Sequence, residues 1–422
     1  MLLIPADPDA SARKIQHALR DRARTSFDLT DPEHRASLDE LTAALLELDQ
    51  DAALAAATRE PDAPLELRLA HKLVASRRWL TTSDRPLKVA VVYAMWGEHN
   101  RLLPRSADNP NGEDSLRVKL DQLAWACAGT PIDWHLVAVD DGCPHGSAEL
   151  ARELAAGHPE GHRVTVLELS QAVPTDSGPL AGLASADDSR KGGAIVLGCQ
   201  HALTEGVDAI AYTDADNSVH LGQLGLLLEP FVERGARVVL GDRKHEDAVL
   251  VKQEARWGIG IALLRHMQRA VGRAIFSRGI LDTQAAFKLY AADVLAPILT
   301  RPTVYDFSFD SDWILGALGQ GAEPVQVPFA FIDSAAESAS ITQGPMTTWE
   351  ALLHGLVASV RRHGVDHDEA MAAVLDEEVR SSADLDRIID TLPPQLTDAP
   401  ADRLGASELM SADDVRAWFR AH

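Results

Sequence analysis

Two aspartates separated by one residue follow an apolar segment in the stretch AYTDADNSVH, which spans residues 211 to 220. In extended backbone, side chains two residues apart point to the same side, so the carboxylates of Asp214 and Asp216 would converge. Converging carboxylates repel each other unless a cation joins them, and hard divalent ions take oxygen ligands and bridge to phosphates. Asp-x-Asp is common and weak by itself, but at a strand end it predicts a metal-diphosphate site.

Acidic residues also follow two other apolar segments. VAVDDGCPHG contains Asp140 and Asp141, and ARVVLGD ends in Asp242. A single acidic strand end can simply be solvated. If these segments are strands of one parallel sheet, however, their carboxyl ends share an edge, and ligands of open α/β sheets bind outside that edge. Three acidic strand ends therefore favour a ligand site there.

Basic residues accompany these acids at two places. In SRKGGAIVLGCQHAL, Arg190 and Lys191 precede two glycines that open a helix-like segment, and a helix N-terminus attracts anions. In GDRKHED, Arg243 directly follows an expected strand. Each could be a solvated basic turn, or could contact a phosphate or the charge that develops on a leaving group.

Polar residues interrupt two apolar stretches near residue 300. In GILDTQAAFKLY, Asp282, Thr283 and Gln284 could hydrogen-bond the hydroxyls of a sugar. In YDFSFDSDWILGAL, Asp310 and Asp312 come just before a helix-like segment. Carboxylates at a helix start are often simple caps. The alternative is a general base that accepts the proton of an attacking hydroxyl.

The order of the segments shows how these residues could be brought together. Apolar segments of strand length alternate with helix-like segments, which is typical of an α/β protein with a mainly parallel sheet covered by helices on both faces. We expect three parts: an N-terminal helical region at 1–85, an α/β domain at 86–340 and a C-terminal helical region at 341–422. The expected strands are residues 87–94, 133–141, 162–169, 207–216 and 236–242.

Composition excludes several functions. The 422 residues include 40 basic and 63 acidic ones, and a net charge of −23 disfavours nucleic acid and anionic membranes as partners. We expect no transmembrane segment and no signal peptide. Three scattered cysteines suit a reducing, cytoplasmic location better than a disulfide framework. The terminal helices could serve packing or a homo-oligomer contact.

Seven motifs, taken in chain order, resemble the family 2 glycosyltransferases with the Rossmann-like GT-A fold. VAVVYAMWGEHNRL resembles the opening strand and its Asn-Glu turn, VAVDDGCPHG the Val-Asp-Asp-Gly-Ser turn, and RKGGAIVLGCQHAL the Lys-Gly helix start. YTDADNSVH resembles the Asp-x-Asp motif, and LGDRKH the Gly-Ser-Arg element. LDTQAAFKLY and FSFDSDWIL are similar to the Asp-Thr-Gln-Cys-Gly-Phe-Lys and Phe-Asp-x-Glu segments of the polyprenyl-phosphate glucosyltransferase branch.

The resemblance covers roughly residues 86 to 340 and implies transfer of a sugar from a nucleotide-sugar, such as a UDP- or GDP-sugar, to an acceptor hydroxyl. It implies Mg²⁺ or Mn²⁺ at Asp216 and Asp214, with Asp214 also on the ribose or sugar side. Asp140 and Asp141 would hold the nucleoside. Asp310 would be the base. The phosphates or the sugar would be contacted by Arg190, Lys191, Arg243 and Gln284. Asp312 and Asp282 are alternative candidates for the base.

The motifs depart from the family pattern at several points. The opening turn lacks the usual Pro, Ala-Ala stands where the branch has Cys-Gly, and FDSD ends in Asp rather than Glu. No membrane helices follow, so we expect a soluble small-molecule acceptor rather than a lipid phosphate. Two alternatives stay open. A sugar nucleotidyltransferase would need a Gly-rich basic loop after the first strand, and a degenerate scaffold module would not need Asp214, Asp216 and Asp310 intact.

Overall fold

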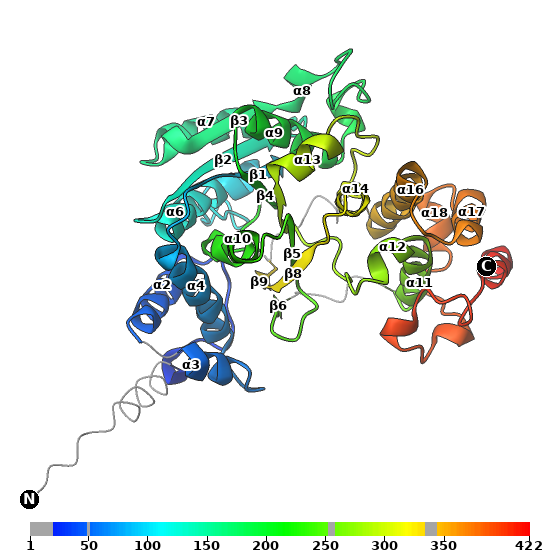
Figure 1. The fold of residues 1–422 in the computed structure, drawn as a ribbon, viewed down its shortest axis with the longest axis horizontal. Helices are drawn as coiled ribbons and strands as arrows, with labels where there is room; N and C mark the ends of the chain where they lie inside the picture. Colours follow the sequence, from blue (N-terminus) through cyan, green and yellow to red (C-terminus); the bar gives the residue numbers. More distant parts are fainter. Residues whose placement is uncertain (1–19, 49–50, 252–257, 334–343) are drawn as a thin grey trace, which may run out of the picture.

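The computed structural model describes residues 20–48, 51–251, 258–333 and 344–422 (Figure 1). The first 19 residues of the expected N-terminal region, and the expected boundary between residues 340 and 341, lie outside the described residues. Within the described part, helices precede and follow a central segment in which strands and helices alternate.

A seven-stranded sheet forms the centre of the molecule, with the strand order β3-β2-β1-β4-β7-β5-β8. All neighbouring strands are parallel except that β7 runs antiparallel to both β4 and β5. The predicted mainly parallel sheet is thus confirmed, and the five expected strands are present with slightly different ends. The strands are β1 (Leu87–Met95), β2 (Ile132–Asp140), β3 (Val164–Glu168), β4 (Ala209–Thr213), β5 (Val238–Asp242), β7 (Phe287–Ala291) and β8 (Val325–Pro328).

Helices cover both faces of this sheet (Figure 1). On one face α6 and α7 pack against β2 while α10 packs against β5 and β7. On the other face α9 packs against β1 and β2, and α13 packs against α9. Gly198 lets α9 approach closely, because a Cβ there would lie 2.5 Å from Val92 Cγ1. The bounds are α6 (Ser115–Cys127), α7 (Ser147–Ala156), α9 (Gly192–Thr204), α10 (Leu224–Glu233), α13 (Ala292–Ile298) and α14 (Phe309–Gly319).

The N-terminal helices dock beside α10 through α4 (Figure 1). The Ser76 hydroxyl donates to the Gly222 carbonyl at 2.6 Å and accepts from the Gly225 amide at 2.9 Å. Their apolar side chains form a second core together with a small parallel pair of strands. The elements are α2 (Pro32–Leu46), α3 (Asp51–Thr58), α4 (Leu65–Thr82), β6 (Val249–Val251) and β9 (Ala330–Ile332).

The C-terminal helices pack against α14 and also against α11, which belongs to the central segment in sequence (Figure 1). The C-terminal helical part of the molecule therefore includes a helix that comes from the central part of the sequence. None of the described helices has both the length and the apolar character needed to cross a membrane. The bounds are α11 (Ile261–Val271), α12 (Arg273–Phe276), α16 (Pro345–His363), α17 (Glu369–Glu378), α18 (Ser382–Asp386) and α19 (Ala412–Ala421).

Short helical segments complete the described chain. They are α5 (His99–Leu102), α8 (Leu169–Ala172), η1 (Gly161–Arg163), η2 (Ala186–Asp188), η3 (Leu221–Gln223), η4 (Pro394–Leu396) and η5 (Ala401–Arg403).

Candidate functional site

The strand register brings the acidic strand ends to one edge of the sheet. Met95 at the end of β1 pairs with Asp140 at the end of β2, and Thr213 at the end of β4 pairs with Tyr93. The antiparallel β7 begins at this same edge, because Phe287 pairs with Thr213. The segment that precedes β7 carries Asp282 and Gln284. The prediction that residues from separate motifs would meet at one edge is borne out by this register.

Lys191 connects two of the strand ends. Its Nζ donates to Asp214 Oδ1, and its backbone amide donates to Asp141 Oδ2 at 2.7 Å. Burial alone would lower the pKa of Lys191, but Asp214 and Asp310 raise it above its usual value. Burial would likewise raise the pKa of Asp214, yet the Lys191 charge lowers it. Lys191 and Asp214 are therefore held in their charged forms.

Gly192, directly after Lys191, allows the start of α9 to lie close to the backbone of Tyr305. A Cβ on Gly192 would lie 2.6 Å from the carbonyl carbon of Tyr305. The Tyr305 carbonyl accepts hydrogen bonds from the amides of Arg190 and Gly193, at 2.9 and 3.2 Å. These two amides, one just before α9 and one in its first turn, are thus bonded within the protein, and an anion here would meet the side chains of Arg190 and Lys191 instead.

The aspartates after β2 retain oxygens that can accept further hydrogen bonds. Asp140 Oδ1 accepts from the Cys143 amide at 2.8 Å, while its Oδ2 and Asp141 Oδ1 are buried without a hydrogen-bond partner among the described residues. Burial raises the pKa of Asp140 above its usual range and the pKa of Asp141 to about 6. A buried acceptor without a donor is costly. Donors of a ligand, such as nucleobase N–H groups or ribose hydroxyls, would satisfy both oxygens.

Arg243 and Asp282 form a buried, bidentate ion pair. The Arg243 Nε and NH2 donate to the two oxygens of Asp282 at 2.8 and 2.7 Å, and the Arg243 amide donates to Oδ2 at 2.9 Å. Burial opposes ionisation of Asp282, but the Arg243 bonds outweigh it and lower its pKa to about 2. Asp282 therefore holds the Arg243 guanidinium in a fixed orientation at the sheet edge.

Asp282→Asn is expected to lower the free energy of unfolding at pH 7 by about 2 kcal/mol, since a pKa of about 2 against the usual 3.8 corresponds to ~1.4 kcal/mol per unit. A lowered folded-state pKa contributes stability above pH 4 that is lost as the pH falls towards 2. Urea unfolding of both proteins at pH 7 and pH 3 measures this. The difference between the two free energies should narrow to roughly half at pH 3, and a constant difference would contradict the assignment.

Asp310 lies in a buried network near the start of α14. Lys288 Nζ donates to Asp310 Oδ1 at 2.6 Å and also to the Ala285 carbonyl at 2.6 Å, and the Tyr212 hydroxyl donates to the same carboxylate oxygen. Burial lowers the pKa of Lys288, and Asp310 opposes that shift. Tyr212 belongs to β4 and Lys288 to β7, so these bonds attach Asp310 to two of the strands that meet at the site edge.

Asp312 lies on a different side of α14 and contacts the C-terminal helices. Arg362 NH1 lies 3.0 Å from Asp312 Oδ2, and His363 Nε2 lies 3.0 Å from Oδ1. Side chains two residues apart converge in extended backbone but diverge on a helix. Asp310 and Asp312 are both helical, so only the first joins the strand-end cluster, and the contacts of Asp312 attach α16 to α14.

The Asp216 carboxylate differs from that of Asp214 in its contacts. Its Oδ1 accepts from the Ser218 amide at 3.0 Å, and no described lysine, arginine or histidine forms an ion pair with it. The described residues contain no group of three or more His, Cys, Asp or Glu side chains arranged to hold a metal. Mg²⁺ and related ions are commonly held by one or two carboxylates together with substrate phosphates. Asp216 and Asp214 fit that arrangement better than a metal site made by protein ligands alone.

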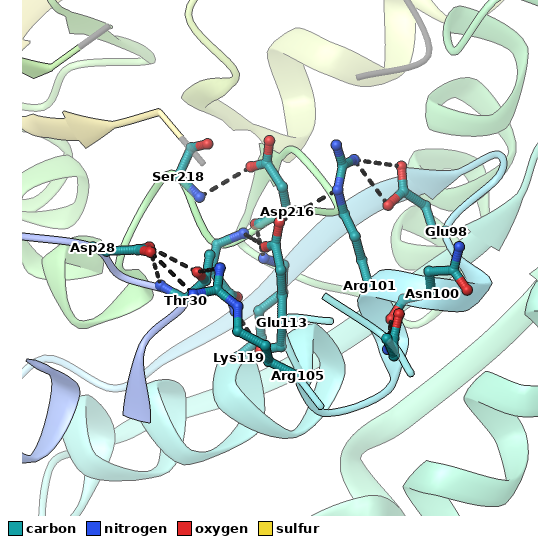
Figure 2. Close-up of polar contacts among 12 residues, drawn as sticks. Asp28, Thr30, Glu98, Asn100, Arg101, Arg105, Glu113, Lys119, Asp216 and Ser218 are labelled. Carbon is teal, nitrogen blue, oxygen red and sulfur yellow. Dashed lines mark hydrogen bonds and ion pairs between the residues drawn. The ribbon is translucent and has the colours of Figure 1, made fainter. Parts of the chain in front are cut away.

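Four residues that the sequence motifs did not indicate also belong to the site (Figure 2): Glu98, Arg101, Glu113 and Lys119. Glu98 follows β1, and both its oxygens accept from Arg101 NH1, at 3.2 and 3.1 Å. Burial raises the pKa of Glu98 to about 7 despite the Arg101 charge. Lys119 had a signal that reasoning from motifs passed over: it interrupts the apolar face of α6, which its fully buried neighbours Leu116, Leu120 and Leu123 define.

A cavity of about 480 Å³ lies at the opposite edge of the sheet. It is lined by residues at the amino ends of β1 and β2, by β3 and by the end of α9, including Lys88, His135, Thr165 and His201. The cavity is therefore separate from the acidic strand ends and contributes nothing to the site described above.

Residues 111–295 match the family model described as Glycosyl transferase family 2. The chain is 28% identical over 224 residues to polyprenol monophosphomannose synthase of Mycolicibacterium smegmatis, a match that covers 53% of this chain and 74% of the relative. It is 26% identical over 224 residues to undecaprenyl-phosphate mannosyltransferase of Micrococcus luteus, covering 53% and 80% respectively.

Solved structures show a weaker likeness. Mannosyl-3-phosphoglycerate synthase from Rubrobacter xylanophilus matches with a TM-score of 0.44 and 17% identity, covering 69% of this chain and 78% of its own. Glucosyl-3-phosphoglycerate synthase from Mycobacterium tuberculosis, in complex with Mn²⁺, UDP and glucosyl-3-phosphoglycerate, matches with a TM-score of 0.42 and 13% identity, covering 70% and 85%. At these TM-scores the likeness supports no conclusion about substrate. Residues 111–295 therefore match a family 2 glycosyltransferase domain, and the chain is similar to two polyprenyl-phosphate sugar transferases.

Proposed function

We propose that this glycosyltransferase moves a hexosyl group from a nucleotide-diphosphate sugar to an acceptor hydroxyl, with Mg²⁺ or Mn²⁺ bound at Asp216 and Asp214. One observation carries the proposal most strongly. The Asp216 carboxylate is without an ion-pair partner among the described residues, at the sheet edge where Lys191 already neutralises Asp214. That edge can accept one divalent cation together with the negative charge of a diphosphate.

The other strand-end residues suit the remaining parts of the donor. The buried acceptor oxygens of Asp140 and Asp141 would take hydrogen bonds from the nucleoside. Gln284 Nε2 is buried without an acceptor among the described residues, which suits a contact with a sugar hydroxyl. When bound, the metal would neutralise the diphosphate and so stabilise its departure. The cationic side chains assigned to the phosphates or the sugar are those of Arg190, Lys191 and Arg243.

Asp310 remains our proposed general base. Asp310 lies in the first turn of α14, and its charge contributes to raising the pKa values of Lys191 and Arg243. Asp282 forms an ion pair with Arg243. Asp312 contacts Arg362 and His363. These contacts favour positioning or structural roles for the two rivals.

The acceptor has two candidate classes. The relatives are a polyprenol monophosphomannose synthase and an undecaprenyl-phosphate mannosyltransferase, which suggests a polyprenyl phosphate as one candidate acceptor. The departures from the branch motifs instead favour a soluble, hydroxylated small molecule. We propose the soluble acceptor, and the experiment below includes a polyprenyl phosphate as a separate arm because the two classes give products of different mass.

Transfer is tested by mass spectrometry of reactions that contain one UDP- or GDP-hexose, one acceptor and either Mn²⁺ or a chelator. We expect a hexosylated product and the free nucleoside diphosphate with one donor class, and only in the presence of the metal. In a parallel reaction that contains pyrophosphate in place of the acceptor, formation of the nucleoside triphosphate and hexose 1-phosphate would indicate a nucleotidyltransferase instead. Equal transfer with the chelator would remove the metal from the proposal, and a product of polyprenyl phosphate alone would overturn the soluble acceptor.

A further inference from the structure

The peptide unit between residues 216 and 217 is held at both of its polar atoms (Figure 2). Lys119 Nζ donates to the carbonyl oxygen of Asp216. The amide of Asn217 donates to Glu113 Oε2 at 2.8 Å. Because one peptide plane contains both the carbonyl and the amide, these two bonds fix its orientation from α6 and from Glu113, two residues before that helix.

A third bond strengthens this arrangement. Asn217 Nδ2 donates to the backbone carbonyl of Glu113 at 2.9 Å. Glu113 is in turn connected to α5 by the Arg101 guanidinium, whose Nε lies 3.3 Å from Glu113 Oε1. Glu113, Asn217 and Lys119 are all essentially inaccessible to solvent. The loop after β4 is therefore held by buried side chains and not merely by solvent-exposed ones.

Lys119 also places a positive charge beneath several carboxylates. Four acidic side chains act on its pKa, and they oppose the lowering that burial causes. They are Asp216, Glu113, Asp214 and Glu98. An isolated buried ammonium is costly, so its retention in the core needs compensating anions. The lysine in turn reduces the repulsion between these acids.

The bonds to the 216–217 peptide leave the Asp216 carboxylate available. Lys119 uses the main-chain oxygen of Asp216, in contrast to Lys191, which bonds the carboxylate of Asp214. In Figure 2 the Asp216 carboxylate points away from Lys119 and Glu113 and towards the amide of Ser218. The two lysines thus have different effects: one occupies a carboxylate, and the other orients one.

We propose that Lys119 and Glu113 are positioning residues for the Asp216 carboxylate, and that they hold its peptide so that the carboxylate meets a divalent metal on the donor diphosphate. This inference rests on the function proposed above. A purely structural role would predict a loss of stability alone. A positioning role predicts that the metal-dependent part of nucleotide binding weakens selectively.

Lys119→Met removes the charge and the donor while keeping a side chain of similar length. Lys72→Met is the matched control, because Lys72 is a buried lysine in α4 whose pKa burial lowers to about 8, and it lies outside the strand-end site. Titration calorimetry with UDP and GDP, with and without Mn²⁺, separates metal-dependent from metal-free binding. Loss of the free Mn²⁺ signal in electron paramagnetic resonance, in the presence of the nucleotide, measures the metal itself.

For Lys119→Met we expect about 10- to 100-fold weaker Mn²⁺ binding in the presence of the nucleotide, as for other residues that orient a metal ligand. Metal-free nucleotide binding should stay within about twofold, and Lys72→Met should change neither quantity. If folded Lys119→Met binds Mn²⁺ as the wild type does, the positioning role is wrong while the proposed function stands. If the wild type itself binds no metal-nucleotide complex, the proposed function fails and this inference fails with it.

Asn217→Ala covers the case in which Lys119→Met does not fold. This change removes only the bond from Nδ2 to the Glu113 carbonyl and leaves the buried charges in place. We expect a smaller loss of Mn²⁺ affinity, about threefold to tenfold, in a folded protein. Unchanged Mn²⁺ affinity in Asn217→Ala, with Lys119→Met unfolded, would show that the network serves stability and would overturn the proposal.

Discussion

Asp216→Ala is expected to lower metal-dependent sugar transfer by roughly three orders of magnitude while the protein stays folded. The size follows from the several kcal/mol that a bound metal contributes to a developing diphosphate charge, at ~1.4 kcal/mol per factor of ten. The protein should stay folded, because the Asp216 carboxylate has one hydrogen bond among the described residues, to the Ser218 amide, and Glu113, Asp214 and Glu98 still compensate the Lys119 charge. Steady-state rates at saturating donor, with circular dichroism for the fold, measure both effects.

Asp413→Ala is a suitable control for this variant. Asp413 is an exposed aspartate in the first turn of α19, and its ion pair with Arg416 is at the surface. Surface pairs of this kind contribute little to stability, so its rate and its fold should match the wild type. An Asp216→Ala enzyme that keeps a metal-dependent rate close to the wild type would remove Asp216 from the metal site.

Asp310→Asn is expected to lower the transfer rate by about 10²- to 10⁴-fold, the usual range for a general base. The same change leaves Lys288 buried without its counter-charge, which costs about 3–5 kcal/mol when one partner of a buried pair is removed. Loss of activity could therefore reflect unfolding, and the single variant does not separate the two effects.

The double variant Asp310→Asn/Lys288→Met separates catalysis from stability. It removes both buried charges, so we expect its free energy of unfolding to recover much of the loss measured for Asp310→Asn. Its transfer rate should remain low. Asp312→Asn is the second comparison, because its contacts are with Arg362 and His363. Its folded molecules should transfer sugar at the wild-type rate, and a double variant with wild-type activity would exclude Asp310 as the base.

The sheet could be predicted from the sequence because its strands are continuous apolar segments. β1, β2 and β4 are buried on both faces, so their composition differs plainly from that of the helices between them. β7 was not predicted, since the polar residues of LDTQAAFKLY hide a strand that is antiparallel to both neighbours. Nor could the packing of α11 with the C-terminal helices be predicted, because it depends on contacts between segments far apart in the chain.

The acidic residues of the site could be predicted from their positions along the chain, whereas the ion pairs that they form could not. Asp140, Asp214 and Asp242 each lie at or just after a strand end, and parallel strands bring such ends to one edge. Which lysine meets which acid depends on side-chain direction and burial. Lys119 and Lys288 are each a single charge within an apolar helix or strand, and their roles are visible only through partners about 97 and 22 residues away in the chain.

The measurement that tests the central claim most directly is the thermal stability of the wild type and of Asp216→Ala with UDP-, GDP- and dTDP-sugars, each with and without Mn²⁺. A ligand present at one hundred times its dissociation constant adds roughly 2.7 kcal/mol to the free energy of unfolding. We predict that one nucleotide class raises the melting temperature of the wild type only when Mn²⁺ is present, and that Asp216→Ala loses this increase. No increase with any donor, or an equal increase in both proteins, would contradict a metal-diphosphate site at Asp216.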